Sequence, residues 1–261
     1  MYSITDDISF PQSLFDLSDH LGLSRKEASY LSWSQLKSEV LDCYKINHIE
    51  RLEALLNFVY QDKKFKQADD NYFTLASIDF GSMLGSRSGH ALTLGLLVQT
   101  LAQVLDLKVQ LHLLPVDVIF SFAYEGEVVY FSPLTGKELS MHEIHCLIRA
   151  EEGNLAPLQP EYLQPTSHDD LMLRLISDTK SSAMLQKKFE VAFHLCNLLI
   201  DWQGRHPHWI RERAFVAQQM GCISFASAEL EILIEEEPDD PLLDLVKYRL
   251  HEMRHQHNVF H

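Results

Sequence analysis

The chain has 261 residues, with 22 Lys and Arg against 37 Asp and Glu, and its formal net charge is −15 at pH 7. This length corresponds to one large or two small domains. The apolar share of 46% and the charged share of 23% are typical of a globular chain and exclude a disordered or collagen-like one. Because phosphate recognition relies on clusters of Lys and Arg, we expect no nucleic-acid partner.

The sequence shows no pattern of a secretory signal or of a membrane span. Residues 1–20 contain no Lys or Arg, whereas a secretory signal begins with a basic region. The longest apolar stretch, residues 91–105, is shorter than the roughly twenty residues of a membrane span. The four cysteines are scattered without a C-x-x-C pair, which is typical of reduced thiols. We therefore expect a cytoplasmic protein with no membrane span.

Hydrophobic periodicity predicts helices first and strands later. Leucines and other apolar residues recur with a period near 3.6 over residues 11–60. Gly81, Gly85 and Gly89 then predict a turn that leads into residues 90–105, which are apolar around most of the circumference and predict a buried helix. Three short runs rich in Val, Ile, Phe and Tyr predict strands at residues 109–114, 117–124 and 128–131, with a hairpin turn at Glu125-Gly126.

A loop rich in Pro and polar residues, 151–170, predicts a boundary between two domains. The first, residues 1–165, is predicted to be helical to about residue 105 and to carry strands over about 109–132. The second, residues 166–261, is predicted to be all helical. Its segments starting at Phe189 and Ile223 match when shifted by 34 residues, the tetratricopeptide period, with Ala192 on Ala226 but Leu195 on Glu229.

The order of glycine turn, buried helix and three strands, the last followed by S-P-x-x-G at residues 132–136, resembles the transglutaminase-like, papain-related fold. Over nearly its full length the chain is similar to the SirB-type family of bacterial proteins, which join such a domain to tetratricopeptide helices. The resemblance implies an α+β fold. A helical N-terminus and a transglutaminase-like core with a small antiparallel sheet would precede a tetratricopeptide-like C-terminal region.

The resemblance also implies where a catalytic triad would lie. Active relatives place Cys at the start of the buried helix, His near the start of the following strand and Asp before a Pro. The matching positions here hold Ala91, Asp117 and Ser132, and no residue from Phe80 to Gln110 is Cys. Without nucleophile and base no covalent intermediate can form, so we predict a pseudoenzyme. The alternative is a residual hydrolase or acyl transferase that uses Ser88, Thr93 or His112.

The start of the buried helix is also a candidate binding site. Arg87, Ser88, His90 and Thr93 surround it, and backbone N–H groups at a helix N-terminus bind anions such as carboxylates. In the alternative interpretation, Ser88 only caps the helix and Arg87 is a solvated surface charge.

The C-terminal segment contains H-E-x-x-H, formed by His251, Glu252 and His255, with His261 at the spacing of a third zinc ligand. This pattern alone indicates a zinc peptidase. The segment, however, continues a helix that begins near Leu242, as a terminal capping helix of a repeat array would. We therefore expect neither a metal site nor a cofactor.

These patterns predict a non-catalytic, cytosolic interaction or regulatory module. Helical repeats stack into grooves that hold extended or helical segments. We expect a protein or peptide partner to bind through the helical repeat region, and the sequence gives no indication of the oligomeric state.

Overall fold

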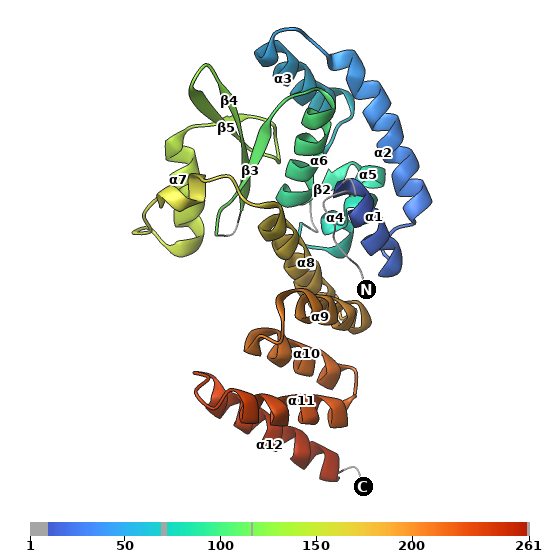
Figure 1. The fold of residues 1–261 in the computed structure, drawn as a ribbon, viewed down its shortest axis with the longest axis vertical. Coiled ribbons are helices and arrows are strands. Elements are labelled where there is room, and N and C mark those ends of the chain that lie inside the picture. Colours follow the sequence, from blue (N-terminus) through green and yellow to red (C-terminus); the bar gives the residue numbers. More distant parts are fainter. Residues whose placement is uncertain (1–9, 69–71, 116, 260–261) are drawn as a thin grey trace. The chain divides into compact units, whose positions relative to one another are not determined.

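The computed structural model describes residues 10–68, 72–115 and 117–259. The chain forms two compact units, unit 1 within residues 1–175 and unit 2 within residues 176–261 (Figure 1). The division falls inside helix α8 (His168–Leu185), and the boundary predicted at 165/166 lies just before this helix. Residues 164–166 are bonded to a strand of unit 1, because Thr166 N donates to Leu111 O over 2.9 Å.

Unit 1 combines helices with two small sheets, so the predicted α+β class is confirmed. Its helical elements are α1 (Phe10–His20), α2 (Lys26–Val40), η1 (Leu41–Cys43), α3 (His48–Asn57), η2 (Phe58–Asp62), α4 (Leu75–Ile78), α5 (Phe80–Ser86), α6 (Ala91–Val104), α7 (Met141–Glu152) and η3 (Pro160–Leu163). Its strands are β1 (Lys66–Gln67), β2 (Ser88–Gly89), β3 (Val109–Leu113), β4 (Val118–Tyr124), β5 (Glu127–Phe131) and β6 (Glu138–Leu139).

The glycine-rich segment before α6 differs from its prediction. Gly81 and Gly85 lie within helix α5, and residues 87–90, which include strand β2, connect α5 to α6. A Cβ on Gly81 would overlap the side chains of Ser24 and Ser29. Gly81 therefore serves the close packing of α5 rather than a turn, and Arg87, with φ of 60°, takes the left-handed conformation that ends the helix.

The four-stranded sheet is antiparallel in the order β3-β4-β5-β6, and the predicted hairpin at Glu125-Gly126 joins β4 to β5. Helix α6 contacts one face of the sheet through β3 and β4. The other face packs on α7, where Ile119 of β4 meets Ile144 and Ile148. The sheet thus lies between α6 and α7 (Figure 1). A second, two-stranded sheet pairs β1 with β2 in parallel and holds the segment before α6 in place.

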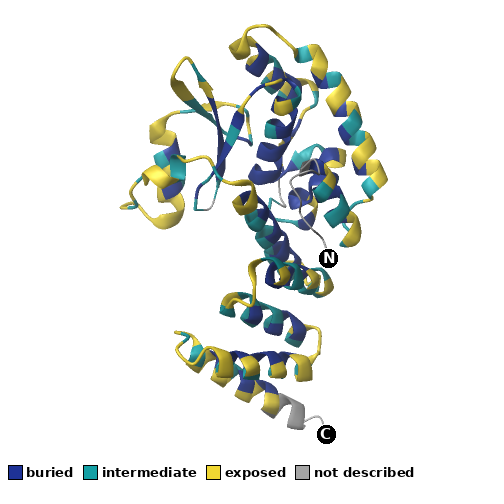
Figure 2. Ribbon diagram, in the orientation of Figure 1, coloured by how far each residue is buried: buried dark blue, intermediate teal, exposed yellow. Residues whose placement is uncertain are grey.

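Helix α6 forms the centre of unit 1. Eleven of its residues are buried, as the apolar sequence predicts (Figure 2). Helices α2, α3 and α4 contact it on the side away from the sheet. At Gly95 the helix approaches the sheet so closely that a Cβ would lie 2.9 Å from Leu111 Cδ2 and 3.6 Å from Pro133 Cγ. The sheet and the turn after β5 are therefore positioned against this helix.

Unit 2 contains the end of α8 and four further helices: α9 (Phe189–Gln203), α10 (Pro207–Gln219), α11 (Ile223–Glu236) and α12 (Leu243–Val259). Consecutive helices from α9 to α12 contact one another. The two segments matched by the 34-residue shift are α9 and α11, and Ala192 and Ala226 are both fully buried. No helix in the described ranges is both long and apolar enough to span a bilayer.

The mismatch of Leu195 with Glu229 has a structural explanation. Glu229 is 6% exposed, in the interior position that Leu195 fills in the first segment. Arg213 of α10 compensates its charge, donating from Nε over 2.8 Å and from Nη2 over 2.5 Å to Glu229 Oε2. The same guanidinium donates from Nη1 to Asn197 Oδ1 on α9 over 2.8 Å. A buried ion pair thus replaces an apolar contact and links three helices.

The turn after β5 yields a test of this packing. Gly136 has φ of 68°, and a Cβ there would overlap the ring of the half-buried Tyr60, whose hydroxyl donates to Pro133 O over 2.6 Å. We expect Gly136→Ala to lower the free energy of unfolding by about 2–5 kcal/mol, the sum of left-handed strain and overpacking. Gly126→Ala, at φ of 89° with no atom within 4 Å, should cost only the strain, about 1–2 kcal/mol. Urea denaturation of both variants measures the difference, and equal losses would contradict it.

Candidate functional site

The candidate site lies at the start of helix α6. Ala91 is the first residue of the helix and is fully buried, so a methyl group occupies the position predicted for a nucleophile. The N-cap is His90, whose backbone N–H donates to Ser77 O over 2.9 Å and whose side chain forms no capping hydrogen bond. The first N–H groups of a helix have no partner within it. The site therefore offers backbone donors and no reactive atom on Ala91.

His90 is a buried, neutral imidazole. It is 4% exposed, and its Nδ1 has no hydrogen-bond partner among the residues that the structure describes. The ring of Tyr72 lies 4.6 Å away and that of Phe73 5.8 Å away, measured between centroids. Burial, together with the smaller effect of the positive charge of Arg174, lowers the pKa of His90 to about 4. The imidazole is consequently uncharged near neutral pH.

Asp117, the residue at the predicted His position, precedes β4. Its Oδ1 accepts a hydrogen bond from Val118 N over 2.8 Å. Burial raises the pKa of Asp117, and the charge of Arg174 opposes that shift. Arg174 thus acts on both His90 and Asp117, which places these two parts of the candidate site within the field of one guanidinium. Arg174 lies on α8, far away in the sequence, and no sequence signal pointed to it.

Ser132, at the predicted Asp position, is part of the tight turn after β5. Its Oγ accepts from Leu134 N over 3.3 Å and its backbone N donates to Lys137 O over 2.9 Å. The next residue, Pro133, faces Gly95 of α6. The turn approaches the helix as the S-P-x-x-G pattern implies, while the Ser132 side chain serves the turn itself.

His112 lies on the sheet face away from α6. Its neighbour Leu111 faces Gly95 of α6, and successive side chains of a strand point to opposite faces. His112 Nε2 is 2.7 Å from Ser121 Oγ, and Nδ1 is 2.9 Å from Gln164 O. Burial lowers the pKa of His112, partly offset by its backbone hydrogen bonds. The structure therefore pairs His112 with a serine and a carbonyl group, and does not bring it to Ser88 or Thr93.

The two other candidate nucleophiles are the hydroxyl groups of Thr93 and Ser88. Thr93 is fully buried, and its Oγ1 lies 2.9 Å from His90 O and 3.1 Å from Ser77 O, so it donates within the turn. Ser88 is a half-buried residue of β2, and it is not the helix cap, because His90 occupies the N-cap position.

Arg87 packs on an aromatic ring. Its guanidinium lies over the ring of Phe65, 4.9 Å from the centroid, and its charge contributes to lowering the pKa of Glu39. Its Nη1 is buried and has no hydrogen-bond partner within the described part of the chain, so Arg87 is not a fully solvated surface charge. The anion-binding group predicted from Arg87, Ser88, His90 and Thr93 is therefore spread over different surroundings.

The H-E-x-x-H segment lies on α12. Glu252 Oε1 accepts from the hydroxyl of Tyr248 over 3.0 Å. The side chains of His255 and His261 lie outside the described residues. Among the side chains that are described, no group of three or more His, Cys, Asp and Glu is arranged to hold a metal ion.

The buried imidazole of His90 predicts acid sensitivity. Its folded pKa of about 4 lies below the ordinary 6.5, so the stabilisation is complete above pH 6.5 and is lost as the pH falls toward 4. At 1.36 kcal/mol per pKa unit, the difference amounts to about 3 kcal/mol. His90→Asn should therefore flatten the loss of unfolding free energy between pH 6.5 and pH 4, whereas His48→Asn, at an exposed residue, should leave it unchanged. Urea titrations at several pH values test this, and an unaltered slope in His90→Asn would refute it.

Comparison with known proteins gives relatives of similar length. The chain is 27% identical to a UPF0162 protein of Vibrio cholerae over 80% of this chain and 78% of the relative. It is 26% identical to the UPF0162 protein YchA of Escherichia coli and 25% identical to Protein SirB1 of Salmonella typhimurium, each over 81% of this chain and 79% of the relative. No solved structure matches the chain.

Two family models match different parts of the chain. The tetratricopeptide repeat model matches residues 180–251, which begin in α8 and end in α12. The predicted similarity to SirB-type proteins is confirmed by the relatives named above. The model of the transglutaminase-like superfamily matches residues 26–177, more than half of the chain, and the chain therefore belongs to the transglutaminase-like superfamily.

Proposed function

We propose that the protein is a non-catalytic, cytoplasmic interaction module, in which the transglutaminase-like unit has lost its chemistry and the repeat unit binds a protein or peptide partner. Ala91 at the start of α6 supports the first part, since a methyl group cannot attack a carbonyl carbon. The four cysteines, all free, lie in η1, in α7, in α9 and at the start of α11, and none lies at the start of α6. The residual hydrolase is the less favoured alternative.

The observation that carries the binding proposal is a pair of cavities on α10 and α12. One, of about 330 Å³, is lined by four residues of α10 and by Arg249 of α12. The other, of about 260 Å³, is lined by Gln218, Gln219 and four residues of α12, again including Arg249. Because Arg249 lines both, the cavities adjoin along the two helices. Grooves between repeat helices are suited to elongated segments.

Arg249 gives this groove a chemical preference. Its guanidinium lies 4.5 Å above the ring of Phe215, and its Nε donates to Gln218 Oε1 over 3.2 Å. Neither a ring nor an amide neutralises its charge. Burial lowers the pKa of Arg249, and the negative charge of Glu252 partly offsets this effect. Leu245 and Tyr248 beside it are 59% and 61% exposed. These features favour a segment that carries a carboxylate next to an apolar side chain.

The proposal is tested by affinity capture from a bacterial cytosolic extract with the full chain as bait. Leu245→Ser and Arg249→Gln should each reduce recovery of a specific partner at least tenfold, since both line the groove. The matched control Leu155→Ser changes a leucine of unit 1 that is 97% exposed, and it should retain the partner. Equal recovery with all four proteins would contradict a repeat-unit groove, and circular dichroism confirms that each variant is folded.

A further inference from the structure

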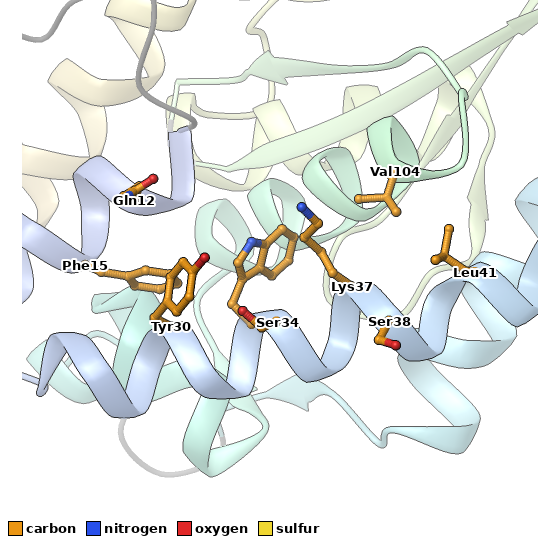
Figure 3. Close-up of a pocket in the computed structure, with 9 residues that line it drawn as sticks. Gln12, Phe15, Tyr30, Ser34, Lys37, Ser38, Leu41 and Val104 are labelled. Atoms are coloured by element: carbon orange, nitrogen blue, oxygen red, sulfur yellow. The ribbon is translucent and has the colours of Figure 1, made fainter.

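A separate groove lies on unit 1, away from the start of α6. It has a volume of about 550 Å³, and its walls come from α1, α2 with the adjoining η1, and the end of α6 (Figure 3). The lining residues are Gln12, Phe15, Tyr30, Trp33, Ser34, Lys37, Ser38, Leu41 and Val104. None of them belongs to the candidate catalytic positions or to the repeat unit.

The groove combines a buried aromatic floor with an exposed apolar rim. Phe15 and Trp33 are 1% and 7% exposed, while Tyr30 and Leu41 are 52% and 53% exposed. Figure 3 shows α2 running along the groove, with Tyr30 near one end and Leu41 near the other. Large exposed apolar side chains beside a groove mark sites of protein interaction. The exposed rim leaves room for a partner that extends along α2.

The length of the groove indicates the kind of partner. Tyr30, Ser34, Lys37 and Leu41 follow the spacing of one helix face. At 1.5 Å per residue, the distance along the axis from Tyr30 to Leu41 is about 16 Å, which equals about three turns of a second helix. A small compact ligand would contact only part of this strip. An amphipathic helix lying along α2 would cover all of it.

Lys37 adds a charge preference. It is the one charged residue that lines the groove, and Figure 3 shows its side chain extending from α2 on the side of Val104. Nearby lysines are neutralised, Lys26 by Asp16 and Lys63 by Glu39. In the described part of the chain, Lys37 has no such carboxylate partner. Although the whole chain is acidic, charges beyond a Debye length of about 8 Å are screened, so Lys37 determines the preference at contact.

We propose that this groove docks an acidic amphipathic helix of about three turns from another protein. Its apolar side chains would pack on Phe15, Tyr30 and Trp33, and a Glu or Asp side chain would pair with Lys37. The apolar contacts supply the affinity, and the ion pair at the rim selects the charge and orientation of the helix. This docking site is independent of the groove on α10 and α12, so either site can fail its test without the other.

The probe is a displayed library of 14-residue peptides, selected separately on the wild-type full chain and on Lys37→Glu. Selection on the wild type should enrich peptides with apolar residues at helical spacing and with Glu or Asp. Enriched peptides are then measured by fluorescence anisotropy. They should bind Lys37→Glu and Tyr30→Ser at least tenfold more weakly than the wild type, and selection on Lys37→Glu should favour Lys and Arg. Lys108→Glu makes the same charge change at an exposed residue outside the groove and should bind like the wild type.

Four results would overturn the proposal. Selection that enriches no helical peptide, or the same peptides on the wild type and on Lys37→Glu, would show that the groove is no acidic-helix site. Enriched peptides that bind Lys37→Glu and Lys108→Glu equally would place them elsewhere on the chain. Sedimentation that detects a wild-type dimer which Tyr30→Ser dissociates would make a second copy of the chain the occupant instead.

Discussion

Burial of helix α6 around most of its circumference is the constraint on which the rest of unit 1 depends. A helix that is apolar around its circumference is stable in water only when other elements cover it. The sheet covers one side of α6, and α2, α3 and α4 cover the other. Its N-terminus consequently lies inside the protein, where unpaired N–H donors and nearby charges act more strongly than at the surface. Such a position can activate a nucleophile, but here it is occupied by Ala91.

Local patterns made much of this fold predictable. The apolar content of residues 90–105, the three strands and the hairpin at Glu125-Gly126 each follow from side chains close together in the sequence, and the structure has all of them. Helix α7 is not among the predicted elements, although Ser140 and Glu143 form a capping box, and their S-x-x-E spacing is a local signal for the start of a helix. Helix α5 forms where the glycine spacing predicts a turn, because that spacing carries no information about the packing of Gly81 against Ser24 and Ser29.

The candidate site was predictable only in part, for a physical reason. A resemblance between sequences locates positions such as Ala91 and Asp117, but the charge that acts near them comes from Arg174, on an element that only folding brings close. The surroundings of His112 show the same limit. The alternation of side chains between the two faces of β3 follows from the sequence. The hydrogen bonds of His112 to Ser121 and to the carbonyl of Gln164 depend instead on which face of the sheet the segment around Gln164 covers. In both cases the surroundings of the residue are set by contacts with residues that are distant in the sequence.

The central claim is that the start of α6 carries no reactive group, and covalent labelling tests it most directly. The purified full chain is incubated with a fluorophosphonate and, separately, with a chloroacetamide, followed by intact-mass analysis and peptide mapping. We predict no fluorophosphonate adduct, and chloroacetamide adducts confined to the exposed Cys146 and Cys222. A stoichiometric fluorophosphonate adduct that disappears in Ser88→Ala or Thr93→Ala would contradict the claim and restore the hydrolase.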